Sequence, residues 1–146
     1  RHTRYISVTG VQTCALPISP QNMQQQTQYN HLINDLIKYF ENKINLANEL
    51  KIEDLIIDIG IGFSKTIEQN FDLIKNLRQF KEFKKPILVG VSRKSFIYKS
   101  LNTNADSALN GTTVLNTISL INGADILRVH DVKEAVECIK LIDLVK

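Results

Sequence analysis

The sequence has few cysteines, little net charge and no long apolar run. Its two cysteines are too few for a disulfide framework, which favours a protein of the reducing cytoplasm. The formal net charge is only +3, so the charge balance does not indicate a nucleic-acid-binding surface. No apolar run approaches the roughly 20 residues that a membrane-spanning helix needs. These absences favour one cytoplasmic globular domain with neither a membrane nor nucleic acid as partner.

Residues 1–19 fit neither a secretory signal nor a buried strand. Polar residues interrupt the apolar run that a signal peptide needs, and Gly10 and Pro17 work against a regular strand. Back-translated, the stretch VTGVQTCALPI can be written as the codons of a common sequencing-library adapter read in frame. We therefore expect residues 1–19 to be a non-native, adapter-derived segment. It contributes two arginines and no acid, so the formal net charge of the remainder falls to +1.

The rest of the sequence alternates helical and strand-like segments. Residues 31–52 place apolar side chains three and four positions apart, which predicts an amphipathic helix. Three short apolar runs rich in β-branched residues predict buried strands, and further amphipathic stretches predict helices between and after them. The predicted strands lie within residues 54–60, 84–92 and 125–131, and the further helices within residues 66–80, 107–124 and 132–145.

This alternation predicts a parallel sheet covered by helices. Two closures are open, a doubly wound sheet and a (β/α) barrel. Polar residues follow all three predicted strands, which favours the barrel, because its site is a ring of loops at the carboxyl ends of the strands. A doubly wound sheet would concentrate such residues at one switch point. Three βα units cannot close a barrel of eight, so the predicted fold class is α/β, a partial (β/α)8 TIM barrel.

The first predicted strand ends in a carboxylate and a glycine-rich loop. Asp58 lies in an apolar run, where a charge costs several kcal/mol unless it is paired or hydrogen-bonded. One interpretation is a ligand-binding carboxylate, and the other is a carboxylate that caps the amides of the following loop. In that loop Gly62 permits close backbone approach and Phe63 presents a flat face.

The other two strands end in cationic groups. Residues 92–95, SRKS, lie between a strand and a helix, where backbone amides with serine and lysine beside them form an anion site. The alternative for this segment is a solvated basic turn. Arg128 and His130 end the third strand and point the same way, because side chains alternate with period two. The alternative for them is a salt-bridged surface pair.

Together these groups suit one kind of ligand. A carboxylate can make paired hydrogen bonds to an amino-pyrimidine edge, cations can bind a diphosphate or a carboxylate, and an aromatic side chain can stack on a ring. A pterin that carries a diphosphate, joined to an aromatic acid, fits this inventory.

The motifs DIGIGFSKT…N, PILVGVSRKSF, GT and GADILRVHDV occur in an order that resembles dihydropteroate synthase, the folate-pathway enzyme that sulfonamides inhibit. PQNMQ, at residues 20–24, resembles the segment after that family's fifth strand. The resemblance covers essentially residues 20–146. It implies that they are the C-terminal part of a pterin-binding TIM-barrel domain, namely its last three βα units with a preceding helix.

The resemblance also implies a role for each residue of the strand-end motifs. Asp58 matches the aspartate that binds the pyrimidine edge of the pterin, and Lys94 the lysine between the pterin and aminobenzoate sites. These two are the expected catalytic residues. The further expected substrate-binding residues are Gly62; Gly90, bordering the pterin; Phe63 and Ser95, in the aminobenzoate pocket; and Arg128 and His130, stacking on the pterin and holding the diphosphate.

The implied reaction joins 6-hydroxymethyl-7,8-dihydropterin diphosphate to 4-aminobenzoate, and releases 7,8-dihydropteroate and diphosphate. The resemblance further implies a magnesium ion, whose ligand is expected in the missing N-terminal half, and a homodimeric full-length parent. Two departures from the family pattern are Ile59, where proline is usual, and Ser64, where glycine is usual. The alternatives are a pterin-binding domain of a cobalamin-dependent methyltransferase and a non-enzymatic fragment. The isolated chain is expected to be inactive.

Overall fold

The computed structural model describes Tyr29 and residues 31–145. The expected adapter-derived segment, residues 1–19, therefore lies outside the described residues, as does the PQNMQ motif. The described elements follow one another along the chain as α1 (Leu32–Glu49), β1 (Ile57–Asp58), α2 (Ile67–Lys75), η2 (Leu77–Phe83), β2 (Ile87–Val89), α3 (Ser95–Ser100), α4 (Leu109–Ile121), β3 (Ile126–Leu127) and α5 (Val132–Val145).

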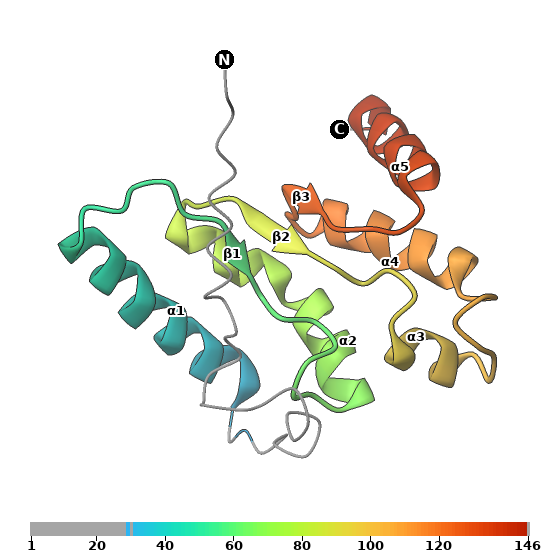
Figure 1. Cartoon of the computed structure of the whole chain (residues 1–146), viewed down its shortest axis with the longest axis horizontal. Helices are drawn as coiled ribbons and strands as arrows, with labels where there is room; N and C mark the ends of the chain where they lie inside the picture. Colours follow the sequence, from blue (N-terminus) through green and yellow to red (C-terminus); the bar gives the residue numbers. More distant parts are fainter. Residues whose placement is uncertain (1–28, 30, 146) are drawn as a thin grey trace.

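The three strands form one parallel sheet in the order β1-β2-β3, with β2 at its centre (Figure 1). Ile57 pairs with Ile87, and Leu88 pairs with both Asp58 and Ile126. Consecutive parallel strands require crossover connections, and here helices supply them. The predicted alternation of strands and helices is thus confirmed in the described part of the chain.

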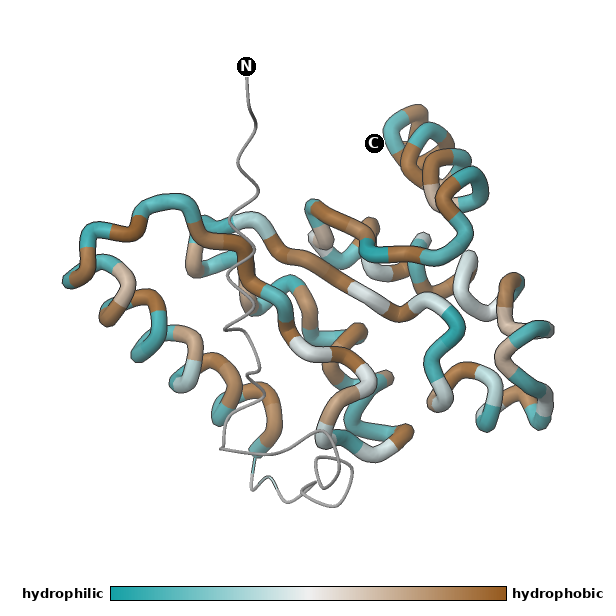
Figure 2. Tube along the Cα trace, in the orientation of Figure 1, coloured by the Kyte–Doolittle hydropathy of each residue, from teal (hydrophilic) through white to brown (hydrophobic). Residues whose placement is uncertain are grey.

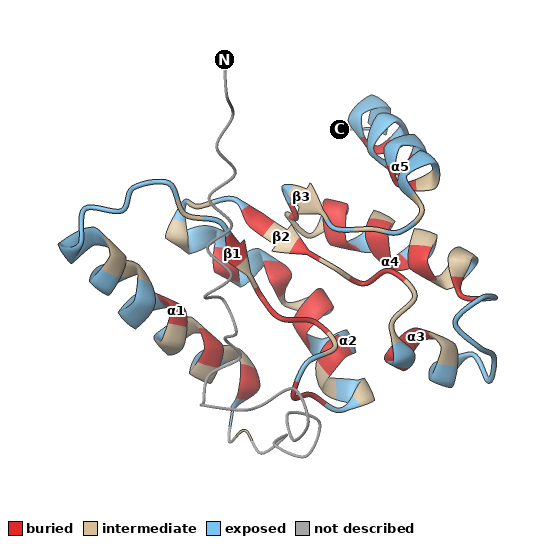
Figure 3. Ribbon diagram, in the orientation of Figure 1, coloured by how far each residue is buried: buried red, intermediate tan, exposed pale blue. Residues whose placement is uncertain are grey.

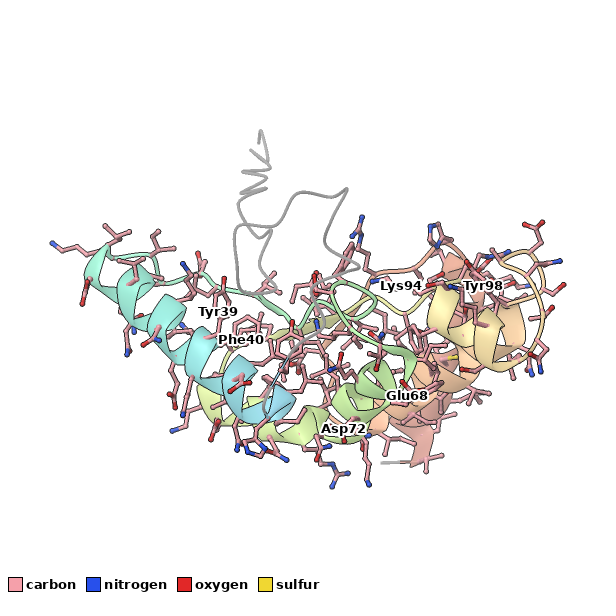
Figure 4. The ribbon with its side chains drawn as sticks, turned by 90° about the horizontal axis from the view of Figure 1, so that it is seen from below. Tyr39, Phe40, Glu68, Asp72, Lys94 and Tyr98 are labelled. Carbon is pink, nitrogen blue, oxygen red and sulfur yellow. The ribbon has the colours of Figure 1, made fainter. Side chains whose placement is uncertain are left out.

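One face of this sheet is packed and the other is more open. Ile57, Ile87 and Val89 are almost fully buried, since they face the helices α1, α2 and α4 that lie on one side of the sheet in Figures 1 and 4. Their neighbours along the strands alternate to the opposite face, where Asp58 and Leu88 are only partly buried. The polar strand-end groups therefore emerge at an open face of the sheet.

The main core lies between the sheet and helices α1 and α2 and the turn η2 (Figure 3). Leu36 and Phe40 of α1 face this core, and Leu77 and Phe80 of η2 fill it with no exposed surface. The rings of Phe40 and Phe80 meet edge to face with centroids 6.1 Å apart, a favourable aromatic geometry.

A second, smaller cluster joins α5 to α4. Leu120, Cys138 and Ile142 are buried together, with Leu127 of β3 packed against them. Ala135 of α5 is buried as well, and most of the remaining surface of this helix is exposed and includes apolar positions (Figures 2 and 3). Leu141 is 64% exposed and Leu144 84% exposed. Helix α5 thus contacts the described fold along one narrow stripe.

One expected helix and the three expected strands differ from the structure in their extent. The helix expected within residues 66–80 ends at Lys75, and a 3-10 turn, Leu77–Phe83, follows it. The side chain of Asn76 donates to the Asp72 carbonyl at this junction, so a local side-chain bond marks the end of the α-helix. The strands are only two or three residues long, shorter than the seven to nine residues of the predicted segments, and β1 and β3 each pair with β2 alone among the described strands.

Candidate functional site

The candidate site lies where the three strands end. In register with one another, Asp58, Leu88 and Ile126 form one row across the sheet. The next row along the same face brings Gly90 beside Arg128, since a Cβ built on Gly90 would lie 3.6 Å from the Arg128 Cβ. With a rise of about 3.3 Å per residue, the two rows are about 7 Å apart. The strands therefore place Asp58, Gly90 and Arg128 on one face.

Asp58 begins the loop that follows β1. Its Oδ1 accepts a hydrogen bond of 2.9 Å from the backbone N–H of Gly60, which has a φ of +66°. This contact is the loop-capping role that the sequence left open for Asp58. It occupies one carboxylate oxygen, and a cap of this kind leaves room for a second hydrogen-bond partner on the other oxygen.

The loop of residues 60–66 is held from inside by two buried polar side chains. The Lys65 ammonium donates to the carbonyls of Gly60 and Phe63 at 2.9 and 3.0 Å. Asn70 of α2 accepts from the Gly62 N–H at 2.6 Å and donates to the Thr66 carbonyl at 2.7 Å. These contacts satisfy backbone groups that a glycine-rich loop would otherwise leave unpaired.

Lys94 crosses from the end of β2 to this loop. Its ammonium donates to the Ile61 carbonyl and lies 4.3 Å from the centroid of the Phe63 ring, within the range of a cation–π contact. Gly62, with a φ of +82°, approaches the Lys94 side chain so closely that a Cβ there would lie 2.5 Å from its Cδ. In Figure 4, Lys94 lies on the side of the molecule away from Glu68 and Asp72 of helix α2.

Arg93 forms an ion pair with Asp131 that joins the loop after β2 to the loop after β3. Its guanidinium binds both carboxylate oxygens of Asp131, at 2.9 and 2.8 Å, and donates to the carbonyls of Ala105 and Asp106. The backbone N–H of Arg93, which has a φ of +53°, donates to the hydroxyl of Thr112. The hydrogen bond from Arg93 lowers the pKa of Asp131, and the same bond raises the pKa of Arg93.

His130 is oriented by the end of β2. The buried Ser92 hydroxyl accepts from the His130 backbone N–H at 3.1 Å and lies 2.9 Å from the ring Nδ1. This contact fixes one side of the imidazole and leaves Nε2 for another partner. Ser95 is exposed and is the first residue of α3, directly after Lys94.

The structure brings part of the predicted set into contact. Gly62, Phe63 and Lys94 meet at one point, and Gly90 meets Arg128. Neither Arg128 nor His130 takes part in a described salt bridge, which was the alternative for these two residues, whereas Arg93 and Asp131 form one.

The sequence prediction gave no role to Lys65, Asn70 or Asp131, although they hold these loops in place. Lysine is almost never fully buried, so sequence patterning alone does not identify a buried lysine such as Lys65. Asn70 and Asp131 lie in the motifs DIGIGFSKT…N and RVHDV, and this position was the available signal.

The described residues form neither a metal-binding cluster nor a membrane-spanning helix. Within Tyr29 and residues 31–145, no group of three or more His, Cys, Asp or Glu side chains gathers in a way that could hold a metal ion. The residues of the candidate site, with one carboxylate in Asp58 and another already bound by Arg93, do not fit a magnesium site of their own. Among the described helices, none is long and apolar enough to cross a membrane.

Sequence comparisons connect this geometry with a known group of enzymes. The family model described as pterin binding enzyme matches residues 1–130. The bifunctional dihydropteroate synthase/dihydropteroate reductase of Helicobacter pylori is 40% identical over 123 residues, which cover 84% of this chain and 32% of that protein. The dihydropteroate synthase of Escherichia coli is 35% identical over 139 residues, covering 92% of this chain and 49% of that protein.

Structural comparison gives the same result. The Yersinia pestis dihydropteroate synthase in complex with a sulfonamide drug superposes with a TM-score of 0.84 at 33% identity, covering 89% of this chain and 48% of that one. The chain thus spans about half the length, or less, of the relatives it matches. Fold and site together define a part of a (β/α)8-barrel enzyme, as the sequence predicted. The chain belongs to the pterin binding enzyme family.

Proposed function

We propose that residues 20–146 are the C-terminal part of a dihydropteroate synthase and carry its pterin and aminobenzoate contacts. The observation that supports this most directly is that Lys94 meets Phe63 and Gly62 just beyond the ends of β1 and β2, the neighbouring strands that lead to these loops and that place Asp58 and Gly90 on one face. A cation beside an aromatic ring and a carboxylate on a neighbouring strand suit two joined aromatic substrates better than one. The dihydropteroate synthases that match the chain support the same assignment.

In the proposed reaction the side chains of this chain bind and orient the two substrates and stabilise the departing diphosphate. Asp58 accepts hydrogen bonds from the donors on the pyrimidine edge of the pterin, while its Oδ1 keeps the loop capped. Arg128 and His130 hold the diphosphate. The bond between the pterin methylene and the diphosphate oxygen breaks, and the aminobenzoate nitrogen attacks the methylene cation and then loses a proton. Lys94 lies between the two substrates, and its charge stabilises the departing anion.

On the aminobenzoate side, the ring of Phe63 packs against the substrate. The hydroxyl of Ser95 binds the substrate carboxylate. We further propose that the full-length protein is cytoplasmic and homodimeric and uses magnesium. The ligands of that ion are proposed to lie in the N-terminal half of the full-length enzyme.

Genetic complementation tests the proposed function. The full-length reading frame that carries residues 20–146 should restore growth to an Escherichia coli strain that lacks its own dihydropteroate synthase. The same frame with Lys94→Ala should not restore it, whereas the exposed-lysine variant Lys75→Met should. Soluble protein that binds methyltetrahydrofolate but never complements would instead favour the pterin-binding domain of a methyltransferase.

A further inference from the structure

Lys65 is a charged side chain with no assigned role, although it is nearly buried. It is 5% exposed, in a chain whose other lysines mostly extend into solvent. Burying an ammonium is costly unless hydrogen bonds replace its water. Here the carbonyls of Gly60 and Phe63 replace part of that hydration, at 2.9 and 3.0 Å.

The two carbonyls mark the ends of one tight turn. The Phe63 N–H donates back to the Gly60 carbonyl at 3.3 Å, so residues 60–63 form a turn with an i to i+3 hydrogen bond. A single ammonium that binds the first and the last carbonyl of this turn fixes the separation of its ends. It also fixes the direction in which Phe63 leaves the backbone.

A second buried group holds the same turn between its ends. Asn70 is 2% exposed, and its Oδ1 accepts from the Gly62 N–H at 2.6 Å, while its amide donates to Thr66. The side chain sits in α2, whose first turn is fixed by a capping box between Thr66 and Gln69. Asn70 thus ties the turn to a rigid element.

The last residue of this turn, Phe63, contacts the Lys94 ammonium through its ring. We propose that Lys65 and Asn70 are positioning residues, which hold residues 60–63 from inside and so set where the Phe63 ring meets the Lys94 ammonium. Because that contact lies on the aminobenzoate side, the two residues govern the affinity for the arylamine and leave the pterin contacts of Asp58 largely unchanged. This inference rests on the proposed function.

Steady-state kinetics of the full-length protein test the assignment. Lys65→Met keeps the length of the side chain and removes its charge, Asn70→Leu keeps the volume and removes both hydrogen bonds, and Lys75→Met is the exposed control. We expect Lys65→Met and Asn70→Leu each to raise the KM for 4-aminobenzoate about tenfold, with kcat and the KM for pterin diphosphate within about threefold of wild type. The control should match wild type.

A double-mutant cycle separates positioning from general damage. If Lys65 acts through Phe63, adding Lys65→Met to Phe63→Ala should change the KM for 4-aminobenzoate by less than about twofold. Two effects that are independent of each other would instead multiply in the double variant. Multiplied effects, equal rises in both KM values, or wild-type kinetics for Lys65→Met would each overturn the inference.

The experiment distinguishes a failure of the proposed function from a failure of the positioning role of Lys65 and Asn70. Wild-type protein with no synthase turnover contradicts the proposed function itself, whereas wild-type turnover with unchanged variants contradicts only the positioning role. Where Lys65→Met does not give folded protein by circular dichroism, Asn70→Leu and its cycle with Phe63→Ala carry the same expectation and the same contradicting outcomes.

Discussion

Asp58 combines a structural contact with the proposed recognition of the pterin. Asp58→Asn keeps the oxygen that accepts from Gly60, so the melting temperature should stay close to that of wild type. It replaces a charged acceptor by an amide that also donates. Hydrogen bonds to charged groups contribute about 1.5–3 kcal/mol, so pterin affinity should fall roughly ten- to a hundredfold in a calorimetric titration.

Ser95→Ala gives the contrast for that titration. Ser95 is exposed at the first position of α3, where backbone N–H groups remain after the hydroxyl is removed. Affinity for 4-aminobenzoate should therefore fall less than pterin affinity falls in Asp58→Asn. Intact pterin binding in Asp58→Asn, together with abolished binding in Ser95→Ala, would contradict both assignments.

Ser64 is a strained position in the loop beside the site. It has a φ of +51°, and its buried hydroxyl has no hydrogen-bond partner in the described part of the chain. A left-handed non-glycine residue costs about 1–2 kcal/mol, and glycine recovers this at some entropic cost to folding. Ser64→Gly should raise the free energy of unfolding of the full-length protein by about 1 kcal/mol.

Ser64→Ala is the matched variant in that denaturation series. It removes the hydroxyl but keeps a Cβ at the left-handed position, so it should gain less stability than Ser64→Gly. A glycine variant less stable than wild type would show that the hydroxyl has a partner in the full-length protein.

At the scale of elements, the Arg93–Asp131 ion pair joins the loops after β2 and β3. The folded state lowers the pKa of Asp131 below its ordinary value. The resulting stabilisation is therefore present above the unfolded pKa of about 3.9 and is lost as the pH falls through the lower folded value. Urea midpoints of wild type should exceed those of Asp131→Asn at pH 7, and the difference should shrink towards pH 3. A difference that persists unchanged at pH 3 would mean that the charge of Asp131 is not its source.

Helix positions and the order of strands were predictable, because apolar periodicity and β-branched runs are local signals. The end of α2 at Lys75 was not, since it depends on how Asn76 bonds back to the helix. The positions of Asp58, Lys94 and Arg128 were predictable because strand ends of a parallel sheet meet at one edge. The contacts of Lys65 and Arg93 were not predictable, because they depend on tertiary packing between loops.

At the scale of the whole molecule, the described fold exposes apolar side chains on several elements. Ile56 beside the sheet is 54% exposed, and Leu141 and Leu144 of α5 are 64% and 84% exposed. Exposed apolar patches and open strand edges favour association. We expect the purified 146-residue chain to bind a hydrophobic dye, to elute as aggregates and to show no synthase turnover. Turnover above background by the chain alone would contradict this expectation.

The central claim, that residues 20–146 carry the pterin and aminobenzoate contacts of a dihydropteroate synthase, is tested most directly by product analysis. Purified full-length protein would be incubated with 6-hydroxymethyl-7,8-dihydropterin diphosphate and 4-aminobenzoate, and dihydropteroate and diphosphate would be quantified together. The account predicts equal amounts of both products, a rate that falls at least tenfold in Lys94→Ala (about 1.4 kcal/mol of transition-state stabilisation), and an unchanged rate in Lys75→Met. Folded wild-type protein that forms no dihydropteroate, or a Lys94→Ala variant as fast as wild type, would contradict it.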